Sequence, residues 1–142
     1  MNQTKPTYFI DSTTLIHAID KNAEHHDECL NVITRAAKGQ INTATSLETI
    51  DETLFILSKL TTTTTALRAT RDFLKMTKIR KFEMNQTILE QALEIIETTP
   101  LKRPKDAINV ATMLEHDIQT IISEDKEYDE VELIHRIHPK EL

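Results

Sequence analysis

Short, apolar, β-favouring segments alternate with helical segments of about a dozen residues, and this alternation strongly limits the folds open to the chain. The strand candidates are residues 7–10, 41–45, 79–84, 120–123 and, more weakly, 132–137. Strands that are separated by helices pair in parallel, and the helices then cover both faces of the sheet. We therefore predict an α/β fold that binds ligands at the carboxyl ends of its strands, near a switch in strand order.

Helical periodicity predicts helices over 15–19, 25–38, 47–60, 66–77, 85–98 and from Pro104 onward. Ser46 suits a helix N-cap, Gly39 suits a helix end, and five consecutive threonines at 61–65 are predicted to separate two helices. In the helix over 47–60, apolar side chains at 3-4-3 spacing predict one buried stripe, made of Leu47, Ile50, Leu54 and Leu57. The helix over 66–77 has one face made of Leu67, Thr70, Leu74 and Thr77.

Composition excludes several classes of protein. The 142 residues suit a single domain over 1–142, and the formal net charge of −6 argues against a general cationic nucleic-acid binder. Gly39 is the only glycine, which excludes a glycine-rich phosphate loop, and a single cysteine excludes a disulfide framework or a cysteine-rich zinc site. No apolar run approaches the roughly 20 residues that span a bilayer. We expect a cytoplasmic protein without membrane contact, with Cys29 in the core and the histidines at the surface.

Four acidic residues fall where such a fold would bring them together. Asp11 and Asp125 follow strand candidates, Asp106 lies in the first turn of the Pro104 helix, and Glu52 lies off the apolar stripe of its own helix. Clustered carboxylates repel one another unless a proton or a cation intervenes, and oxygen ligands favour Mg²⁺ or Mn²⁺. The alternatives are a helix-capping role for Asp11 and a solvated position for Glu52.

Four sequence blocks in the same order resemble the PIN-domain family, and within it the single-domain toxins of the VapC type. They are Tyr8-Phe9-Ile10-Asp11-Ser12-Thr13, the segment 45–52, the segment 105–111 and the segment 121–129. The most specific is the last, in which a strand is followed by Ser, an acid and an aromatic-Asp pair. The resemblance covers residues 8–129 and implies a three-layer α/β/α sandwich around a parallel sheet of about five strands.

The resemblance also implies an activity. It points to a divalent-metal-dependent endoribonuclease that leaves a 5′-phosphate and a 3′-hydroxyl, the toxin of a toxin–antitoxin pair. It implies catalytic and metal-binding roles for Asp11, Glu52, Asp106 and Asp125, with Asp129 as a further metal ligand. Ser12, Ser123 and Asn109 match positions that orient such a site. A homodimer and an antitoxin partner are implied by the family alone.

An acidic ribonuclease still needs cations to hold RNA. Lys102, Arg103 and Lys105 come just before Asp106, where they would lie near the scissile phosphate. A second set lines one predicted helix face at 3-4-3 spacing and comprises Arg68, Arg71, Lys75 and Lys78. The alternative for this helix face is a solvated surface without a partner. Residues 54–60 and the basic helix after them are a further candidate for a partner surface.

Two other functions compete with the nuclease. One is a phosphoacceptor domain with Asp11 at its strand end, but residue 13 is Thr, so an Asp-x-Asp pair is missing. The other is a catalytically weak PIN-like protein that binds RNA or serves as a scaffold. The presence of all four acids argues against this second function.

Overall fold

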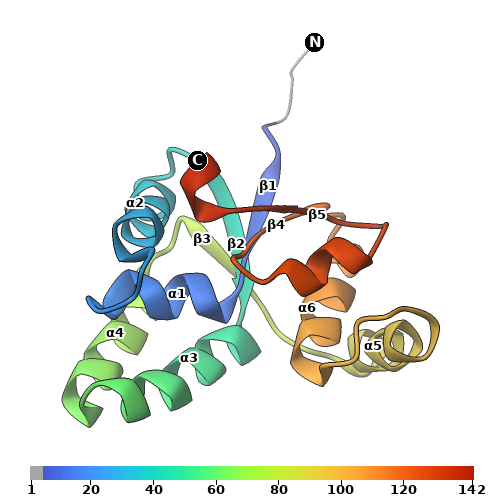
Figure 1. Cartoon of the computed structure of the whole chain (residues 1–142), viewed down its shortest axis with the longest axis horizontal. Helices are drawn as coiled ribbons and strands as arrows, with labels where there is room; N and C mark the ends of the chain where they lie inside the picture. Colours follow the sequence, from blue (N-terminus) through green and yellow to red (C-terminus); the bar gives the residue numbers. More distant parts are fainter. Residues whose placement is uncertain (1–4) are drawn as a thin grey trace.

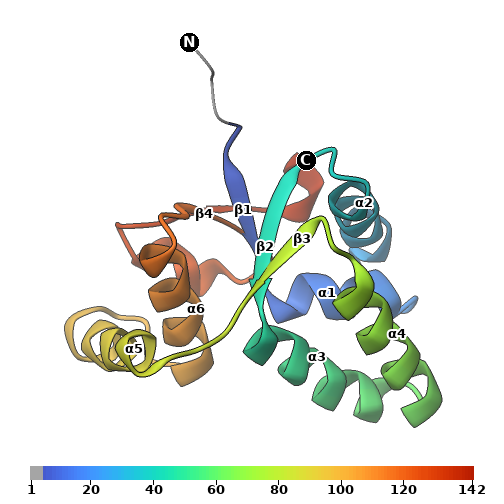
Figure 2. The same cartoon turned by 180° about the vertical axis from the view of Figure 1, so that it is seen from behind.

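The computed structural model describes residues 5–142, and its centre is a parallel sheet of five strands in the order β3-β2-β1-β4-β5 (Figures 1 and 2). Phe9 of the central strand β1 faces Ala44 of β2 on one side and Ile121 of β4 on the other. The strands are β1 (Thr7–Ile10), β2 (Asn42–Ser46), β3 (Ile79–Phe82), β4 (Thr120–Ile122) and β5 (His135–Ile137). The predicted parallel α/β sheet is confirmed.

Helices cover both faces of this sheet, so the molecule has three layers. Figure 1 shows α1 to α4 on one face and α5 and α6 on the other. The helices are α1 (Ser12–Ile19), α2 (His26–Ala37), α3 (Leu47–Leu60), α4 (Thr63–Lys75), α5 (Gln86–Thr98) and α6 (Pro104–Glu115). Short 3₁₀ helices follow at η1 (Lys126–Glu130) and η2 (Pro139–Glu141). None of the helices in residues 5–142 is long and apolar enough to cross a membrane.

Alternating side chains of the central strands feed two separate hydrophobic cores. Phe9 and Ile121 pack with α5 and α6, whereas their neighbours Ile10 and Ile122 pack with α1 to α4. All four side chains are completely buried, as expected for strands that are covered on both faces. Strands β1 and β4 are therefore packed against helices on both faces.

The order of the strands reverses beside β1. The chain first builds β2 and β3 on one side of β1, then crosses through α5 and α6 to build β4 and β5 on the other. The carboxyl ends of β1 and β4 consequently lie next to each other at the switch point. Open α/β sheets bind ligands at this position, and Asp11 and Ser123 directly follow these two strands.

Several local signals in the sequence act as predicted. Ser46 caps α3 by accepting a hydrogen bond from the Thr49 N–H at 3.0 Å, and Pro104 begins α6. The break between α3 and α4 lies in the threonine run but is shorter than predicted, because Thr62 already caps α4, accepting from the Thr65 N–H at 3.1 Å, and the helix begins at Thr63. Gly39 ends α2 with a φ of +73°, a conformation that suits glycine.

The apolar face of α4 differs from the prediction. Its buried side chains are Ala66, Ala69 and Phe73, whereas Leu67 and Leu74 are 39% and 48% exposed. Two alanines let α4 pack closely on its neighbours, and this close packing outweighs the larger transfer free energy of leucine. The predicted stripe of α3 is also incomplete: Ile50 and Leu57 are buried, Leu54 is half-buried, and Leu47 at the helix start is exposed.

Candidate active site

The carboxylate of Asp11 is enclosed at the carboxyl end of β1. Its Oδ1 accepts hydrogen bonds from the Thr14 N–H at 3.0 Å and the Thr14 hydroxyl at 2.9 Å, so Asp11 caps α1. Its Oδ2 accepts from the Ser123 hydroxyl. Burial nevertheless raises the pKa of Asp11 to about 6, because desolvation outweighs these hydrogen bonds and Asp106 adds a repulsive charge. The capping and active-site interpretations of Asp11 are therefore compatible.

Ser123 connects the ends of β1 and β4. Besides donating to Asp11, its Oγ accepts from the Asp125 N–H at 3.0 Å. Asp125 Oδ1 in turn accepts from the Glu127 N–H at 2.9 Å, which starts η1 and fixes the carboxylate at the turn. Ser123 is fully buried, so its hydrogen bond to Asp11 is protected from water. The loop after β4 is thus oriented by side chains within the site.

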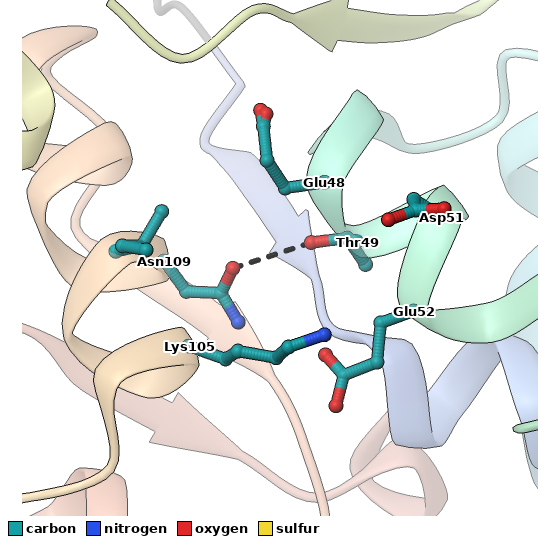
Figure 3. Close-up of a pocket in the computed structure, with 7 residues that line it drawn as sticks. Glu48, Thr49, Asp51, Glu52, Lys105 and Asn109 are labelled. Atoms are coloured by element: carbon teal, nitrogen blue, oxygen red, sulfur yellow. Dashed lines mark hydrogen bonds between the residues drawn. The ribbon is translucent and has the colours of Figure 1, made fainter. Parts of the chain in front are cut away.

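Asp106 enters the site from the first turn of α6. Its Oδ1 accepts a hydrogen bond from the Tyr128 hydroxyl at 3.1 Å, and that hydroxyl accepts from Asn109 Nδ2 at 3.0 Å. Asn109 Oδ1 accepts from the Thr49 hydroxyl at 3.2 Å, which links α6 to α3 (Figure 3). Burial raises the pKa of Asp106, partly offset by nearby Arg103.

One oxygen of Asp106 is buried without a hydrogen bond. This atom is Oδ2, and its nearest cation is Arg103, whose Nε lies 3.7 Å away, beyond hydrogen-bond distance. Arg103 Nη1 also lies 3.5 Å from Asp125 Oδ2. Asp106, Asp125 and Glu127 each offer one carboxylate oxygen, and these oxygens lie within 4.8 Å of one another. An unpaired buried oxygen among three carboxylates fits a hard divalent cation.

Glu52 lies beside this group, across a pocket between α3 and α6. The pocket has a volume of about 200 Å³, and Glu52, Thr49, Lys105 and Asn109 are among the residues that line it. Figure 3 shows Lys105 and Glu52 extending toward each other from opposite walls. The Glu52 charge contributes to raising the pKa of Arg103, so the two share one electrostatic environment. Glu52 is half-buried.

Asp129 lies in an ion pair apart from the three-carboxylate group. Its two oxygens accept from Arg136 Nε at 2.9 Å and Nη2 at 3.0 Å, which lowers the pKa of Asp129. Arg136 Nη1 also donates to the Ser123 carbonyl at 3.0 Å. Asp129 therefore helps to fix η1 against the end of β4. Ser12 is the first residue of α1 and is buried beside Asp11.

The two predicted cationic sets lie in different places. Lys102, Arg103 and Lys105 are exposed around the start of α6, and the ammonium of Lys102 donates to the Ile96 carbonyl at 2.6 Å. Arg68, Arg71 and Lys75 line a shallow hollow along α4, whereas Lys78, predicted on the same helix face, lies after the helix has ended at Lys75. Figures 1 and 2 both show α4 on the far side of α3 from α6. The structure thus places the first set nearer to the acids.

Sequence reasoning did not assign functional roles to Glu127, Tyr128 and Thr49. Glu127 reaches the acidic group because a one-turn 3₁₀ helix follows Asp125, and such a turn has no periodic signal. Tyr128 is an aromatic residue in an otherwise polar segment and is buried in the structure. This isolated aromatic residue was a signal that could have suggested a buried hydroxyl with polar partners. Thr49 lies three residues after the cap residue Ser46 and is hydrogen-bonded to it. In the sequence, that position indicates only a residue of the capped first turn and not a residue of the site.

Comparison with known proteins identifies the family and supports the fold. The sequence profile of the PIN domain matches residues 8–133. No curated protein is similar enough in sequence to match the chain.

Three solved structures illustrate the structural likeness. VapC20 from Mycobacterium tuberculosis, a toxin that cleaves the sarcin–ricin loop, is 18% identical with a TM-score of 0.74, over 86% of this chain and 92% of that one. A toxin–antitoxin complex from Klebsiella pneumoniae is 17% identical with a TM-score of 0.66, over 93% and 97%. VapBC2 from Rickettsia felis, bound to a fragment of its promoter DNA, is 14% identical with a TM-score of 0.70, over 93% and 98%. With its profile match over residues 8–133, the chain belongs to the PIN-domain family.

Proposed function

We propose that the protein is a divalent-metal-dependent endoribonuclease. The observation that carries the proposal is the buried Oδ2 of Asp106, which accepts no hydrogen bond from residues 5–142 and has only the 3.7 Å ion pair with Arg103, among the carboxylates at the switch point of the sheet. A buried carboxylate oxygen without a hydrogen bond is costly, and a cation bound there would relieve that cost. Mg²⁺ or Mn²⁺ matches the donor set, which consists of oxygen atoms alone.

The proposed roles of the acids follow from their surroundings. Asp106 and Asp125 would hold the ion, directly or through water, and Glu127 lies within reach as an additional ligand. Asp11 is not one of the three grouped carboxylates, but it interacts electrostatically with Asp106 and would also hold the ion, directly or through water. The ion, when bound, makes hydroxide available near neutral pH and offsets negative charge on the phosphate oxygens. Glu52, on the pocket wall, would bind a second ion or orient the attacking water.

Supporting groups hold these acids in place. Ser123 fixes Asp11 and Asp125 relative to each other, and Tyr128 and Asn109 fix Asp106. A metal-ligand role for Asp129 stays a prediction. To bind the ion, Asp129 would first have to break its two hydrogen bonds to Arg136. We assign no chemical step to Ser12.

We propose RNA as the substrate and a toxin–antitoxin setting. Phosphates next to the scissile bond would be contacted by the cations at the start of α6, which are Lys102, Arg103 and Lys105. If the RNA passes over α3, its more distant phosphates would be contacted by the cations of α4, which are Arg68, Arg71 and Lys75. The toxin–antitoxin complexes among the similar structures support an antitoxin as partner. A homodimer and a location in the cytoplasm are predictions of the same proposal.

The test is incubation of the purified protein with a pool of structured RNAs, with Mg²⁺, with Mn²⁺ and with chelator. Asp11→Asn and Asp106→Asn are compared with Asp117→Asn, a matched control on the exposed loop after α6. We expect cleavage that requires metal, survives in the control and falls at least about 100-fold in both site variants. Cleavage products that carry a 5′-phosphate would support the proposed chemistry.

Calorimetric metal titration completes the experiment. Metal binding without cleavage of any RNA in the pool would overturn ribonuclease activity and favour an RNA-binding or scaffold protein. Absence of both metal binding and cleavage would overturn the acidic site itself. Cleavage that persists with chelator would contradict metal dependence.

A further inference from the structure

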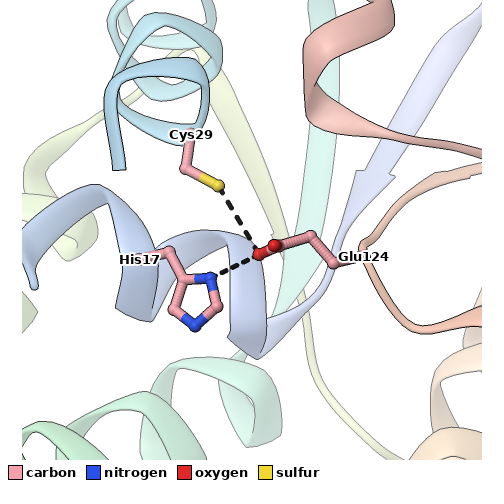
Figure 4. A group of neighbouring side chains, drawn as sticks. All are labelled: His17, Cys29 and Glu124. Carbon is pink, nitrogen blue, oxygen red and sulfur yellow. Dashed lines mark hydrogen bonds and ion pairs between the residues drawn. The ribbon is translucent and has the colours of Figure 1, made fainter. Parts of the chain in front are cut away.

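Three side chains of different ligand types meet on the α1–α4 side of the sheet, outside the acidic group described above. They are His17 of α1, Cys29 of α2 and Glu124 of the loop after β4 (Figure 4). One ligand atom from each lies within 4.8 Å of the others. The sequence prediction placed Cys29 in the core and the histidines at the surface. Cys29 is indeed buried, but His17 joins it at the edge of the core and keeps only 29% of its side chain exposed.

Glu124 is the centre of this cluster. Its Oε2 contacts His17 Nδ1 directly and lies 3.9 Å from Cys29 Sγ. Two ligands of a tetrahedral zinc ion lie about 3.3–3.8 Å apart, given usual Zn–N, Zn–O and Zn–S lengths. At 3.9 Å, the sulfur lies slightly farther from the carboxylate oxygen than two ligands of one zinc ion do, so it would have to move in by a few tenths of an ångström. The imidazole and the carboxylate would have to separate slightly to admit an ion.

Further imidazoles surround the other oxygen of Glu124. His25 Nε2 lies 3.9 Å from Glu124 Oε1, and the rings of His25 and His138 pack edge to face with centroids 4.6 Å apart. His25 precedes Cys29 by four residues at the start of α2, so the two point to the same side of that helix. The four candidate ligands thus come from three segments, namely α1, α2 with its cap and the loop after β4, and Glu124 is only 16% exposed.

We propose that His17, Cys29 and Glu124 form a zinc-binding site that is distinct from the acidic site, with His25 or water at the fourth position. A thiolate together with imidazole and carboxylate suits Zn²⁺, whereas Mg²⁺ avoids sulfur. Binding would release the Cys29 thiol proton to solvent and replace the His17–Glu124 contact with two metal–ligand bonds.

This inference goes beyond the proposed function and does not depend on it. The two sites use different residues and select different metals. They are nevertheless adjacent in the chain, because Glu124 lies between Ser123 and Asp125. A bound zinc ion would therefore tether the loop that orients Asp125.

The test uses Co²⁺ as a spectroscopic substitute for Zn²⁺ on the full chain. A cobalt–thiolate bond gives a charge-transfer band in the near ultraviolet, and tetrahedral coordination gives intense visible bands. We expect both to saturate at one equivalent of Co²⁺ and to disappear when Zn²⁺ is added. In Cys29→Ser the charge-transfer band should be lost, and in His17→Gln the affinity should fall at least about tenfold.

Two variants distinguish this site from the acidic site and from surface histidines. Asp106→Asn disrupts the acidic site and should leave the cobalt spectrum unchanged, and His135→Gln, an exposed histidine on β5, is the matched control. Circular dichroism of each variant checks that the fold is retained. A wild-type spectrum without the charge-transfer band would overturn the proposal. So would a band that survives in Cys29→Ser or one that appears only when the protein is unfolded.

Discussion

One buried carboxylate, Asp11, caps a helix and belongs to the proposed metal site. Its hydrogen bonds cap α1, and its pKa is raised from 3.8 to about 6 by burial. The native state therefore binds this proton more tightly than the unfolded chain does between about pH 4 and 6. From this group alone, stability is greatest below pH 4 and falls as the pH rises toward 7.

We predict that Asp11→Asn removes this loss of stability. In chelator, the shift of about two pKa units corresponds to about 3 kcal/mol at pH 7, and asparagine carries no buried charge. The variant should be at least as stable as wild type at pH 7 and gain nothing at pH 4. Urea denaturation at both pH values measures the effect, with Asp117→Asn as control. A variant that is less stable than wild type at pH 7 would show that hydrogen bonds to the charged form outweigh burial.

The hydroxyl of Tyr128 is a second residue-scale test. Tyr128→Phe keeps the ring but leaves Asn109 Nδ2 and Asp106 Oδ1 without the partner that now connects them. We expect a loss of about 1–3 kcal/mol in unfolding free energy and weaker Mn²⁺ binding, measured by denaturation and calorimetry. Tyr8→Phe, on β1, is the matched control. Equal stability of the two variants would mean that water replaces the lost hydroxyl.

Sequence could locate only some of these residues. Asp11 stands directly after β1, Asp106 in the first turn of α6 and Asp125 three residues after the end of β4, positions that local patterns predict. Glu127 and Tyr128 depend on a short 3₁₀ turn and on a partner across the site, which no local pattern encodes. Asp129 differs from the other acids in its pairing with Arg136, and that pairing also forms only in the folded chain.

At the scale of elements, helix boundaries follow from caps, and one cap also belongs to the site. Ser46 is buried, accepts from the Thr49 N–H and shares a 2.8 Å hydrogen bond with the Thr49 hydroxyl. Thr62 caps α4 with the same geometry but is exposed. The two caps therefore differ in burial and in their connection to the pocket.

We predict that Ser46→Ala destabilises the protein more than Thr62→Ala. Loss of a cap lowers the free energy of unfolding by about 1 kcal/mol. In Ser46→Ala the Thr49 hydroxyl and N–H are buried, so water does not replace the hydrogen bonds that they lose, and the loss should be larger. Thermal and urea unfolding of both variants measure the difference. Equal losses would indicate that burial adds nothing to this cap.

Periodicity predicted where helices lie better than which faces they bury. All six expected helices are present, but on α4 the alanines face inward and Leu67 and Leu74 face outward. Which side of an amphipathic helix is covered depends on how closely its neighbours approach, and that is a property of the assembled layers.

At the scale of the whole molecule, function depends on the order of the strands. The parallel sheet and its helical layers follow from alternation along the sequence, but the order β3-β2-β1-β4-β5 does not. That order places Asp11 beside Ser123 and brings α6 across the switch point. Figures 1 and 2 also show α4, which carries the second cationic set, on the far side of α3 from α6.

This separation leads to the last prediction. In an Asp106→Asn background that cannot cleave, reversing Lys102 and Lys105 to Glu should weaken RNA binding and reduce its salt dependence. The logarithmic salt slope should fall by about 0.7 for each phosphate of single-stranded RNA that the variant no longer neutralises. Reversing Arg68 and Arg71 on α4 should have a smaller effect, because α4 lies on the far side of α3 from α6, which carries Asp106. Fluorescence anisotropy over a salt series measures both. A larger loss of affinity from the α4 pair would place the main RNA track over α3 and contradict an approach along α6.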